Sequence, residues 1–210
     1  MGKRQQTREK IEAQIIELGR RHLVTEGAAG LSLRAIARDL GMVSSAVYRY
    51  VASRDDLLTL LLVDAYSELA DAVDDAAARG GPWRDQLLAM ARAARAWAVD
   101  QPARWALLYG SPVPGYHAPR EQTVEPGTRV VGALFRAVEG GIAAGDIAQS
   151  NIAAAQPLSA DFEAIRQEFA FGGDDAAVAR CSVLWAGLVS ATVSLWAALY
   201  RPTPSASPAE

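Results

Sequence analysis

The amino-acid sequence predicts an all-α protein. Apolar residues recur at helical spacing along almost the whole chain, and no run alternates between apolar and polar residues with a period of two. Half of the 210 residues are hydrophobic, which is enough for a sizeable core. Glycine and proline separate the helical segments, so the helices can be placed in order along the chain.

The first predicted helix covers residues 7–26. Ile11, Ile15 and Leu18 lie on one face, and Gly27 is a typical residue to end the helix. His22 continues the same face, and we expect it to pack there. The chain has only two histidines and one cysteine, spread over about 160 residues, so we expect no metal site.

The second predicted helix is short and amphipathic. Ser32 is a natural N-cap, and Gly41 supplies a left-handed stop after the helix. The apolar positions between them follow the i, i+3, i+4, i+7 pattern of one buried face, and they are Leu33, Ile36, Ala37 and Leu40.

A third predicted helix of about two turns covers residues 44–50. Val43 lacks a side-chain acceptor, so Ser44 is the candidate N-cap. Val47 and Val51 are one helical turn apart and are expected to face the interior.

A fourth helix is predicted to begin at Ser53, which forms a capping-box-like pair with Asp56. It runs to about residue 79, where the sequence RGGP breaks it. Later helices are predicted over residues 83–100, 103–109, 128–144, 159–169 and 174–200. The four prolines of residues 110–127 predict a loop there, and residues 202–210 form a Pro- and Ser-rich tail that we expect to be disordered.

Charge is distributed unevenly along the chain. Residues 1–54 hold 10 Lys and Arg against 5 Asp and Glu, a net charge of +5, whereas the remaining residues hold 11 against 19, a net charge of −8. A basic head on an acidic body is the pattern expected when only the head contacts a polyanion, although chance clustering on a solvated surface is an alternative.

Two short helices joined by a glycine-containing turn match the helix-turn-helix plan, in which the second helix enters the major groove of DNA. Ser44, Ser45 and Ala46 are small and permit close approach to the groove. We expect Tyr48 and Arg49 to face the duplex; packing of Tyr48 against the second helix is the alternative.

The segment LSLRAIARDLGMVSSAVYRYVASRDDLL, residues 31–58, resembles the signature of the tetracycline-repressor (TetR) family of transcriptional regulators. With the first helix included, the resemblance spans about residues 7–60. It implies a three-helix helix-turn-helix DNA-binding domain over residues 1–54. A C-terminal helical bundle for regulation and dimerisation would follow over residues 55–201.

The resemblance also implies roles for individual residues. Ser32 and Tyr50 would bind phosphates, Arg34 a base or phosphate, and Lys3 and Arg4 would form a flexible arm. Ala46 stands where a threonine is frequent, which leaves at most a methyl group for thymine. The implied DNA-binding residues are Lys3, Arg4, Ser32, Arg34, Ser44, Ser45, Ala46, Tyr48, Arg49, Tyr50 and Arg54.

In that family the C-terminal bundle dimerises through its last helices and holds a small-molecule cavity. Helical spacing gives a candidate dimer interface at Val131, Leu134, Cys181, Leu184, Trp185, Leu188, Thr192 and Leu195. The same face could instead complete the core of one chain. Aromatic and polar residues suited to an effector pocket are Trp97, Trp105, Tyr109, Tyr116, His117 and Phe135, although aromatics at helical spacing are also common core residues.

The sequence thus favours a cytoplasmic, homodimeric, effector-responsive repressor that binds a palindromic DNA operator. Its single cysteine excludes an intrachain disulfide, and no cofactor is expected. An all-α enzyme is one alternative, but we find no phosphate-binding loop, HExxH or GxSxG motif. A membrane-anchored interaction protein is another, because residues 181–200 carry no charge, yet their many small and polar residues favour a packing helix.

Overall fold

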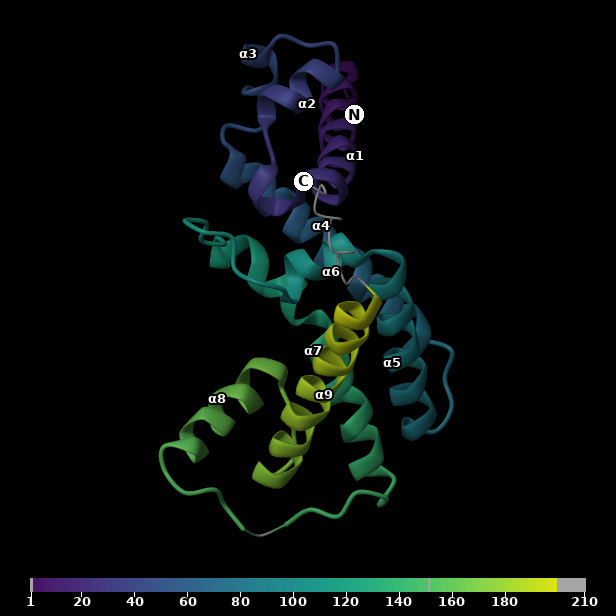
Figure 1. Ribbon diagram of the computed structural model, residues 1–210. Helices are drawn as coiled ribbons and strands as arrows, with labels where there is room; N and C mark the ends of the chain where they lie inside the picture. Colours follow the sequence, from purple (N-terminus) through teal and green to yellow (C-terminus); the bar gives the residue numbers. More distant parts are fainter. Residues whose placement is uncertain (1, 151, 200–210) are drawn as a thin grey trace, which may run out of the picture. The chain divides into compact units, whose positions relative to one another are not determined.

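The structure is a computed structural model that describes residues 2–150 and 152–199, with the side chains of residues 3, 4 and 192–199 outside that description. All regular secondary structure in the described residues is helical, which confirms the predicted all-α class (Figure 1). The chain divides into two compact units, Met1–Ala137 and Val138–Glu210. The tail of residues 202–210, for which disorder is predicted, lies outside the described residues.

The first unit begins with four helices, α1 (Lys3–Gly30), α2 (Leu33–Asp39), α3 (Ser44–Val47) and α4 (Arg54–Ala77). Within α1, Gly27 has φ +68° and interrupts the helix, as predicted, and one more turn follows it. A side chain at this φ would strain the backbone, so glycine suits the break.

The core of these helices is apolar and closely packed. Ile15 of α1, Ile36 of α2 and Val47 at the end of α3 have no exposed surface. Leu57 and Leu58, in the first turns of α4, are also fully buried in the same cluster. The start of α4 therefore completes the core beneath the helix-turn-helix.

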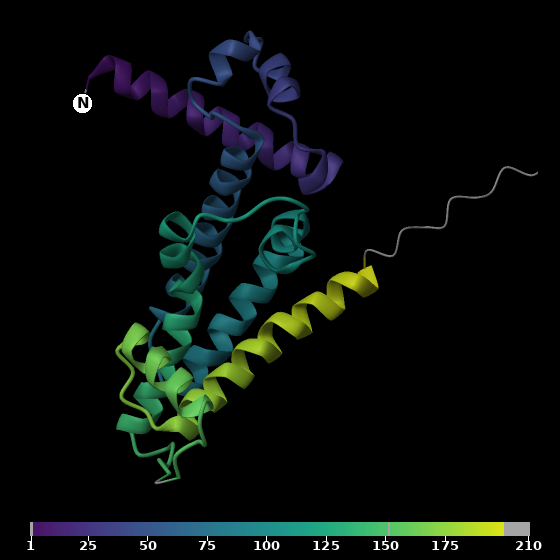
Figure 2. The same ribbon diagram turned by 90° about the vertical axis from the view of Figure 1, so that its left-hand side faces the viewer.

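Helix α4 is the centre of the first unit and packs against α1, α5 (Trp83–Asp100) and α6 (Pro102–Tyr109). It leads from the group formed by α1, α2 and α3 and runs alongside α5 (Figures 1 and 2). The predicted break between α4 and α5 is confirmed: Gly80 and Gly81 have positive φ, and Pro82 caps α5.

Helix α7 (Arg120–Ala143) crosses the boundary between the two units. The prediction of a loop over residues 110–127 is therefore wrong for its second half. Pro126 lies inside the helix, where a proline removes one backbone hydrogen bond. The ring is buried, and its packing offsets part of that loss.

The second unit contains α8 (Leu158–Phe169) and α9 (Asp175–Leu199), which pack against each other. Two acids at the start of α9 fasten the segment that precedes α8. The backbone N–H of Ser150 donates to Asp174, and that of Ala154 donates to Asp175 at 2.7 Å. Arg166 of α8 binds Asp175 at 2.5 Å, so one carboxylate joins the segment to both helices.

Candidate nucleic-acid interface

Helix α2 forms at the predicted position because its ends carry the required local chemistry. The Ser32 hydroxyl oxygen accepts a hydrogen bond from the N–H of Ala35 at 3.5 Å, which caps the helix start. Gly41 has φ +66°, and the N–H of Met42 donates to the carbonyl of Ala37 to close the helix end. This geometry sets the turn that leads into α3.

Helix α3 is shorter than predicted. It covers Ser44–Val47, and residues 48–50 form turns. Its N-cap is Val43, which has no side-chain cap, so the expectation that Ser44 caps this helix is wrong. Val47 and Val51 are 0% and 2% exposed, as expected of anchors that hold the segment to its own domain.

The predicted DNA-contacting residues of this segment differ in exposure. Tyr48 is 44% exposed, and Ser45 and Arg49 are exposed as well. Ser44 and Ala46 are half-buried. The tip of α3 therefore presents small side chains, and an aromatic and a cationic side chain follow immediately after the helix.

Arg34 and Ser32 lie at the start of α2, which packs against α3. Arg34 is exposed and Ser32 is half-buried. Tyr50 is partly buried and packs against the core below, which leaves less of its side chain available to DNA than the sequence suggests. Lys3 and Arg4 begin α1, so the expectation that they form a flexible arm is wrong, and their side chains lie outside the described residues.

Arg54 has a structural role in addition to the one predicted for it. Its Nη2 donates to the carbonyl oxygens of Ala28 and Ala29, at 2.9 and 3.1 Å. These carbonyls end α1, where backbone acceptors lack partners within the helix. Arg54, at the first position of α4, thereby fastens the end of α1 to α4.

His22 also has a partner that the sequence does not indicate. Its Nε2 lies 2.7 Å from the carboxylate of Asp39, at the last residue of α2. The prediction that His22 is a packed helix residue is confirmed, since its side chain is only 15% exposed. The pair is 17 residues apart in sequence, so only the folded arrangement of α1 and α2 brings it together.

Comparison with known proteins identifies this helix-turn-helix. Residues 15–61 match the family model "Bacterial regulatory proteins, tetR family", and residues 87–200, more than half of the chain, match "Tetracyclin repressor-like, C-terminal domain". The chain belongs to the TetR family. Members of the TetR family are transcriptional regulators that bind DNA and typically dimerise.

Individual relatives agree with this assignment. The TetR-family chain is 65% identical over 193 residues to "HTH-type transcriptional regulator Rv1816" of Mycobacterium tuberculosis, which covers 91% of this chain and 82% of the relative. It is 42% identical over 69 residues to "HTH-type transcriptional repressor DrrR1" of Streptomyces coeruleorubidus, which covers 32% of this chain and 24% of that relative.

Solved structures have the same fold. The regulatory protein SCO4313 superposes with a TM-score of 0.76 and 32% identity, covering 95% of this chain and 90% of that one. A TetR-family regulator from Streptomyces coelicolor A3(2) superposes with a TM-score of 0.55 and 22% identity, covering 92% and 76% of the two chains. At that identity, the second comparison supports the fold alone.

Three of the residues predicted for an effector pocket in this TetR-family chain form an aromatic cluster. The ring centroids of Trp105 and Tyr109 on α6 lie 4.6 Å apart, and Trp97 of α5 lies 6.5 Å from Trp105. Tyr66 of α4, which the sequence analysis missed, meets Tyr109 edge-on at 6.3 Å. Burial raises the pKa of both Tyr66 and Tyr109 above the ordinary value.

The other three predicted pocket residues lie elsewhere. The Tyr116 hydroxyl is 2.9 Å from that of Thr59 on α4, and its ring packs against the core of the DNA-binding helices. His117 is exposed, and Phe135 is buried on α7. A hollow of about 570 Å³ lies between α1 and the end of α2, and none of the predicted pocket residues lines it.

The residues predicted for dimerisation also divide by exposure. Cys181 is fully buried within the chain and Leu134 is 9% exposed, whereas Leu184 is 45% exposed. Val131, Trp185 and Leu188 are half-buried, and the side chains of Thr192 and Leu195 lie outside the described residues. Only the residues that keep exposed surface can offer area to a second chain.

Two further properties concern the alternatives to a DNA-binding regulator. Within residues 2–150 and 152–199, no helix combines the length and the apolar character that crossing a membrane requires. Over the same part of the chain, no three His, Cys, Asp or Glu side chains lie close enough together to hold a metal ion.

Proposed function

We propose that this TetR-family regulator is a homodimeric repressor that binds a palindromic operator through α2 and α3 and is released by a small-molecule effector. The observation that carries the proposal is the orientation of α3. Val47 and Val51 are buried in the domain, while Ser45, Tyr48 and Arg49 face outward on the basic N-terminal part of the chain. DrrR1 is named a transcriptional repressor, which supports the repressor part of the proposal.

The proposed contacts with DNA follow from the exposed groups. Ser45 and Ala46 admit α3 to the major groove, where Tyr48 and Arg49 contact the duplex. Arg34 binds a base edge or a phosphate from the start of α2. Ser32 accepts from the Ala35 N–H, and its hydroxyl hydrogen remains available to donate to a phosphate oxygen.

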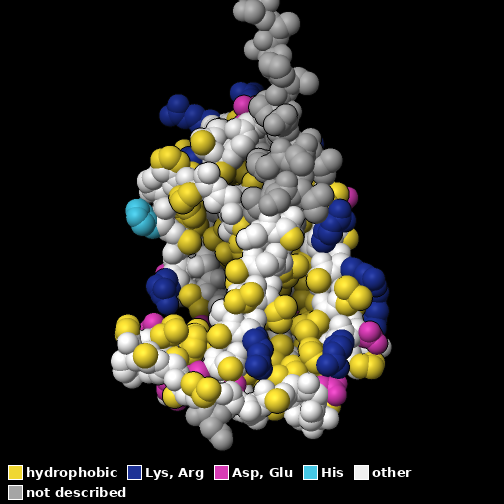
Figure 3. Space-filling model, turned by 60° about the horizontal axis from the view of Figure 1, so that its bottom comes forward, with side chains coloured by type: hydrophobic (Ala, Val, Ile, Leu, Met, Phe, Trp, Pro, Cys, Tyr) yellow, Lys and Arg dark blue, Asp and Glu magenta, His cyan; other side chains and the backbone are white. Residues whose placement is uncertain are grey.

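Exposed apolar side chains on α9 support the proposed dimer. Val183 is 72% exposed and Leu184 is 45% exposed on a helix that carries no charge after Arg180. Figure 3 shows hydrophobic side chains exposed over the side of the molecule that it draws. A second copy of α9 would remove these side chains from water, as in helical bundles that pair through their terminal helices. The domain limits at residues 54 and 201 are part of the same proposal.

The aromatic cluster supports the proposed effector response. Trp105 is 2% exposed, and its indole N–H has no acceptor among the described residues. A buried donor without a partner is unfavourable by about 1–3 kcal/mol, so a ligand with a hydrogen-bond acceptor would gain from meeting it. Effector binding that favours another arrangement of the bundle would then shift the population away from DNA binding.

Fluorescence anisotropy with duplexes from the intergenic DNA that flanks the gene tests the proposal. At physiological salt the expected dissociation constant for one such duplex is roughly 10⁻⁸ to 10⁻¹¹ M, and it should rise steeply with salt. Equal affinity for these duplexes and a shuffled control would contradict the proposal. Sedimentation of the free protein as a single chain at micromolar concentration would contradict its dimeric part.

A further inference from the structure

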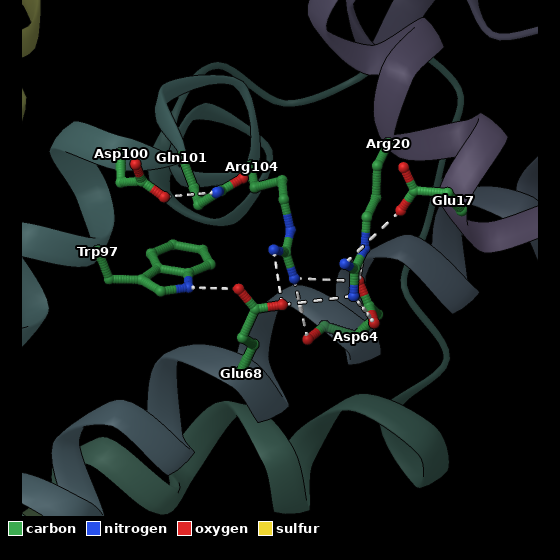
Figure 4. Close-up of polar contacts among 8 residues, drawn as sticks. All are labelled: Glu17, Arg20, Asp64, Glu68, Trp97, Asp100, Gln101 and Arg104. Carbon is green, nitrogen blue, oxygen red and sulfur yellow. Dashed lines mark hydrogen bonds and ion pairs between the residues drawn. The ribbon is translucent and has the colours of Figure 1, made fainter. Parts of the chain in front are cut away.

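Four charged side chains join the DNA-binding helices to α6, and we refer to Arg20, Asp64, Glu68 and Arg104 as the charge cluster. Asp64 and Glu68 lie one turn apart on α4, so their carboxylates are on the same face. Arg20 reaches them from α1 and Arg104 from α6 (Figure 4). Two cations and two anions make the cluster neutral.

Arg20 binds Asp64 in a two-pronged geometry. Its Nε and Nη2 donate to the two carboxylate oxygens at 2.8 and 2.6 Å, and Nη2 is also 3.3 Å from Glu68. The hydrogen bond to Asp64 raises the pKa of Arg20 above its ordinary value. Paired bonds of this kind fix the orientation of the guanidinium as well as its position.

Arg104 binds the same two carboxylates and is far more buried. Its side chain is 4% exposed, Nη2 lies 3.0 Å from Asp64, and Nη1 lies 2.8 Å from Glu68. Trp97 of α5 donates its indole N–H to the other oxygen of Glu68 at 3.1 Å, and the Arg104 guanidinium lies over its ring. Glu68 is thereby held in one orientation.

We infer that Arg104 is a positioning residue for DNA binding, which sets the angle of α1, and with it α2 and α3, on α4. Arg104 contacts neither α2 nor α3 in any described interaction and acts through carboxylates that it shares with Arg20. Without Arg104, Asp64 and Glu68 would face Arg20 alone, with one cation for two partly buried anions. Such an imbalance is unfavourable above all for Asp64, whose side chain is only 19% exposed, so α1 and α4 would settle in a looser arrangement.

The packing of α6 explains why Arg104 can hold the carboxylates of α4 in a fixed position. Ala103 and Leu107, one helical turn apart, pack against the core of the DNA-binding helices. Trp105 lies on the opposite side of α6, next to Tyr109 in the aromatic cluster. The carboxylates are thus held against a helix that is itself packed into the head.

The inference rests on the proposed function, because the angle of α1 matters most when two heads must bind one duplex. Dimeric helix-turn-helix proteins bind half-sites about 34–36 Å apart, so a fixed head angle selects one half-site spacing. A head that can change its angle should accept other spacings. Arg104 should therefore affect discrimination between spacings, which simple loss of folded protein does not change.

The test compares Arg104→Met with Arg129→Met as its control; the Arg129 side chain is 31% exposed and that of Arg104 is 4% exposed. Arg129 makes the same kind of double ion pair with α4, at 2.8 Å to Asp71 and 2.7 Å to Asp74, but reaches it from α7. The probes are the tightest duplex that the wild-type full-length chain selects from a random pool and two derivatives, with one base pair inserted or deleted between half-sites. Anisotropy gives the dissociation constant for each, and circular dichroism checks folding.

Arg104→Met is expected to bind the selected duplex roughly 5- to 150-fold more weakly. The ratio of its dissociation constants for the altered and the selected spacings is expected to fall toward one. Arg129→Met is expected to keep the wild-type discrimination. The inference would be overturned if Arg104→Met discriminates between half-site spacings as well as wild type does, or if both variants lose this discrimination equally. If Arg104→Met does not fold, Arg104→Lys replaces it in the test. Lysine keeps the charge but cannot bind both carboxylates with a forked group. Full discrimination between spacings in Arg104→Lys would overturn the inference, and reduced discrimination would support it. If the wild-type chain selects no sequence, the proposed function fails, and the inference falls with it.

Discussion

Base preference in this protein should depend on few side chains, because the tip of α3 presents only Ser44, Ser45 and Ala46. None of them can make the two-pronged contacts that distinguish base pairs most strongly. Arg34, exposed in the first turn of the neighbouring helix α2, can make such a contact with guanine. At the scale of single residues, specificity is therefore expected to depend on α2 as much as on α3.

Substitution of Arg34 tests this expectation. Arg34→Ala should weaken binding to the preferred duplex by about 1–3 kcal/mol and flatten the preference at one base position. Arg38→Ala is the control, because Arg38 is exposed at the other end of the same helix. Binding to a library of single-base variants gives the comparison; an unchanged base preference in Arg34→Ala would refute the assignment.

Trp105 offers a second prediction at this scale. Trp105→Phe keeps an aromatic ring in the cluster but removes the buried N–H donor. Affinity for DNA should be unchanged, while affinity for an effector that accepts this hydrogen bond should fall by about 1 kcal/mol, or roughly fivefold. A thermal-shift screen on the wild-type protein supplies the ligand, and titration compares the variants. Trp83→Phe, at the outer end of α5, is the control, and equal affinity in Trp105→Phe would contradict the assigned contact.

At the scale of elements, helix ends control how α2 presents α3. Gly41 has φ +66° with no atom near the position of a side chain, so only backbone strain opposes its substitution. Gly41→Ala should lower the free energy of unfolding by about 1–2 kcal/mol. Gly41→Asn should lower it less, because asparagine tolerates this conformation. Urea denaturation separates the two, and equal losses would show that strain at Gly41 is not the cause.

The start of α9 gives a prediction about acid. The Ala154 N–H and then Arg166 lower the pKa of Asp175, and Arg166 lowers that of Glu163. A carboxyl group with a lower pKa in the folded state stabilises the fold above its unfolded pKa, and this contribution is lost as the pH falls through the folded value.

Asp175→Asn should therefore be less stable than wild type at pH 7, and the difference should shrink as the pH falls below the ordinary carboxyl pKa and Asp175 takes up a proton. Urea midpoints across this range provide the measurement. Glu168→Gln, an exposed change on α8, should follow the wild-type curve. A constant difference between Asp175→Asn and wild type at every pH would show that the ionised carboxylate is not responsible.

Helix ends were predictable from sequence because their chemistry is local. Gly27, Gly41 and the Ser53–Asp56 cap need only neighbouring residues, and all three act as expected. Helix α3 is shorter than predicted because Tyr50 packs against the core in a turn. The start of α7 was missed because proline predicts a break unless packing compensates for it.

At the scale of the whole molecule, contacts between residues far apart in the chain could not be predicted from the sequence. Arg20 and Asp64 are 44 residues apart, and no spacing rule pairs them. The sequence equally does not predict the contact between Tyr116 and Thr59, which are 57 residues apart. Of the side chains that the family signature pointed to on α2 and α3, only some are exposed, and the signature did not indicate that Arg54 fastens the end of α1.

The proposed dimer is tested at this scale. Val183→Asp places a charge where 72% of the valine is exposed on α9, so the single chain should fold while pairing is disrupted. Sedimentation should show a monomer, with much weaker binding to DNA. Leu158→Asp, at a leucine that is 49% exposed at the start of α8, should remain dimeric. If Val183→Asp remains dimeric, the interface does not include this part of α9.

The shared core beneath the helix-turn-helix limits how this protein can be divided. Leu57, Leu58 and Leu61 belong to that core, and Leu107 and Tyr116 pack against it from much later in the chain. A fragment that ends before α4 would leave an open apolar face. Chimaeras that exchange the DNA-binding head should therefore carry the first turns of α4 and matching residues on α6, because a junction directly before α4 would divide one apolar core between two parents.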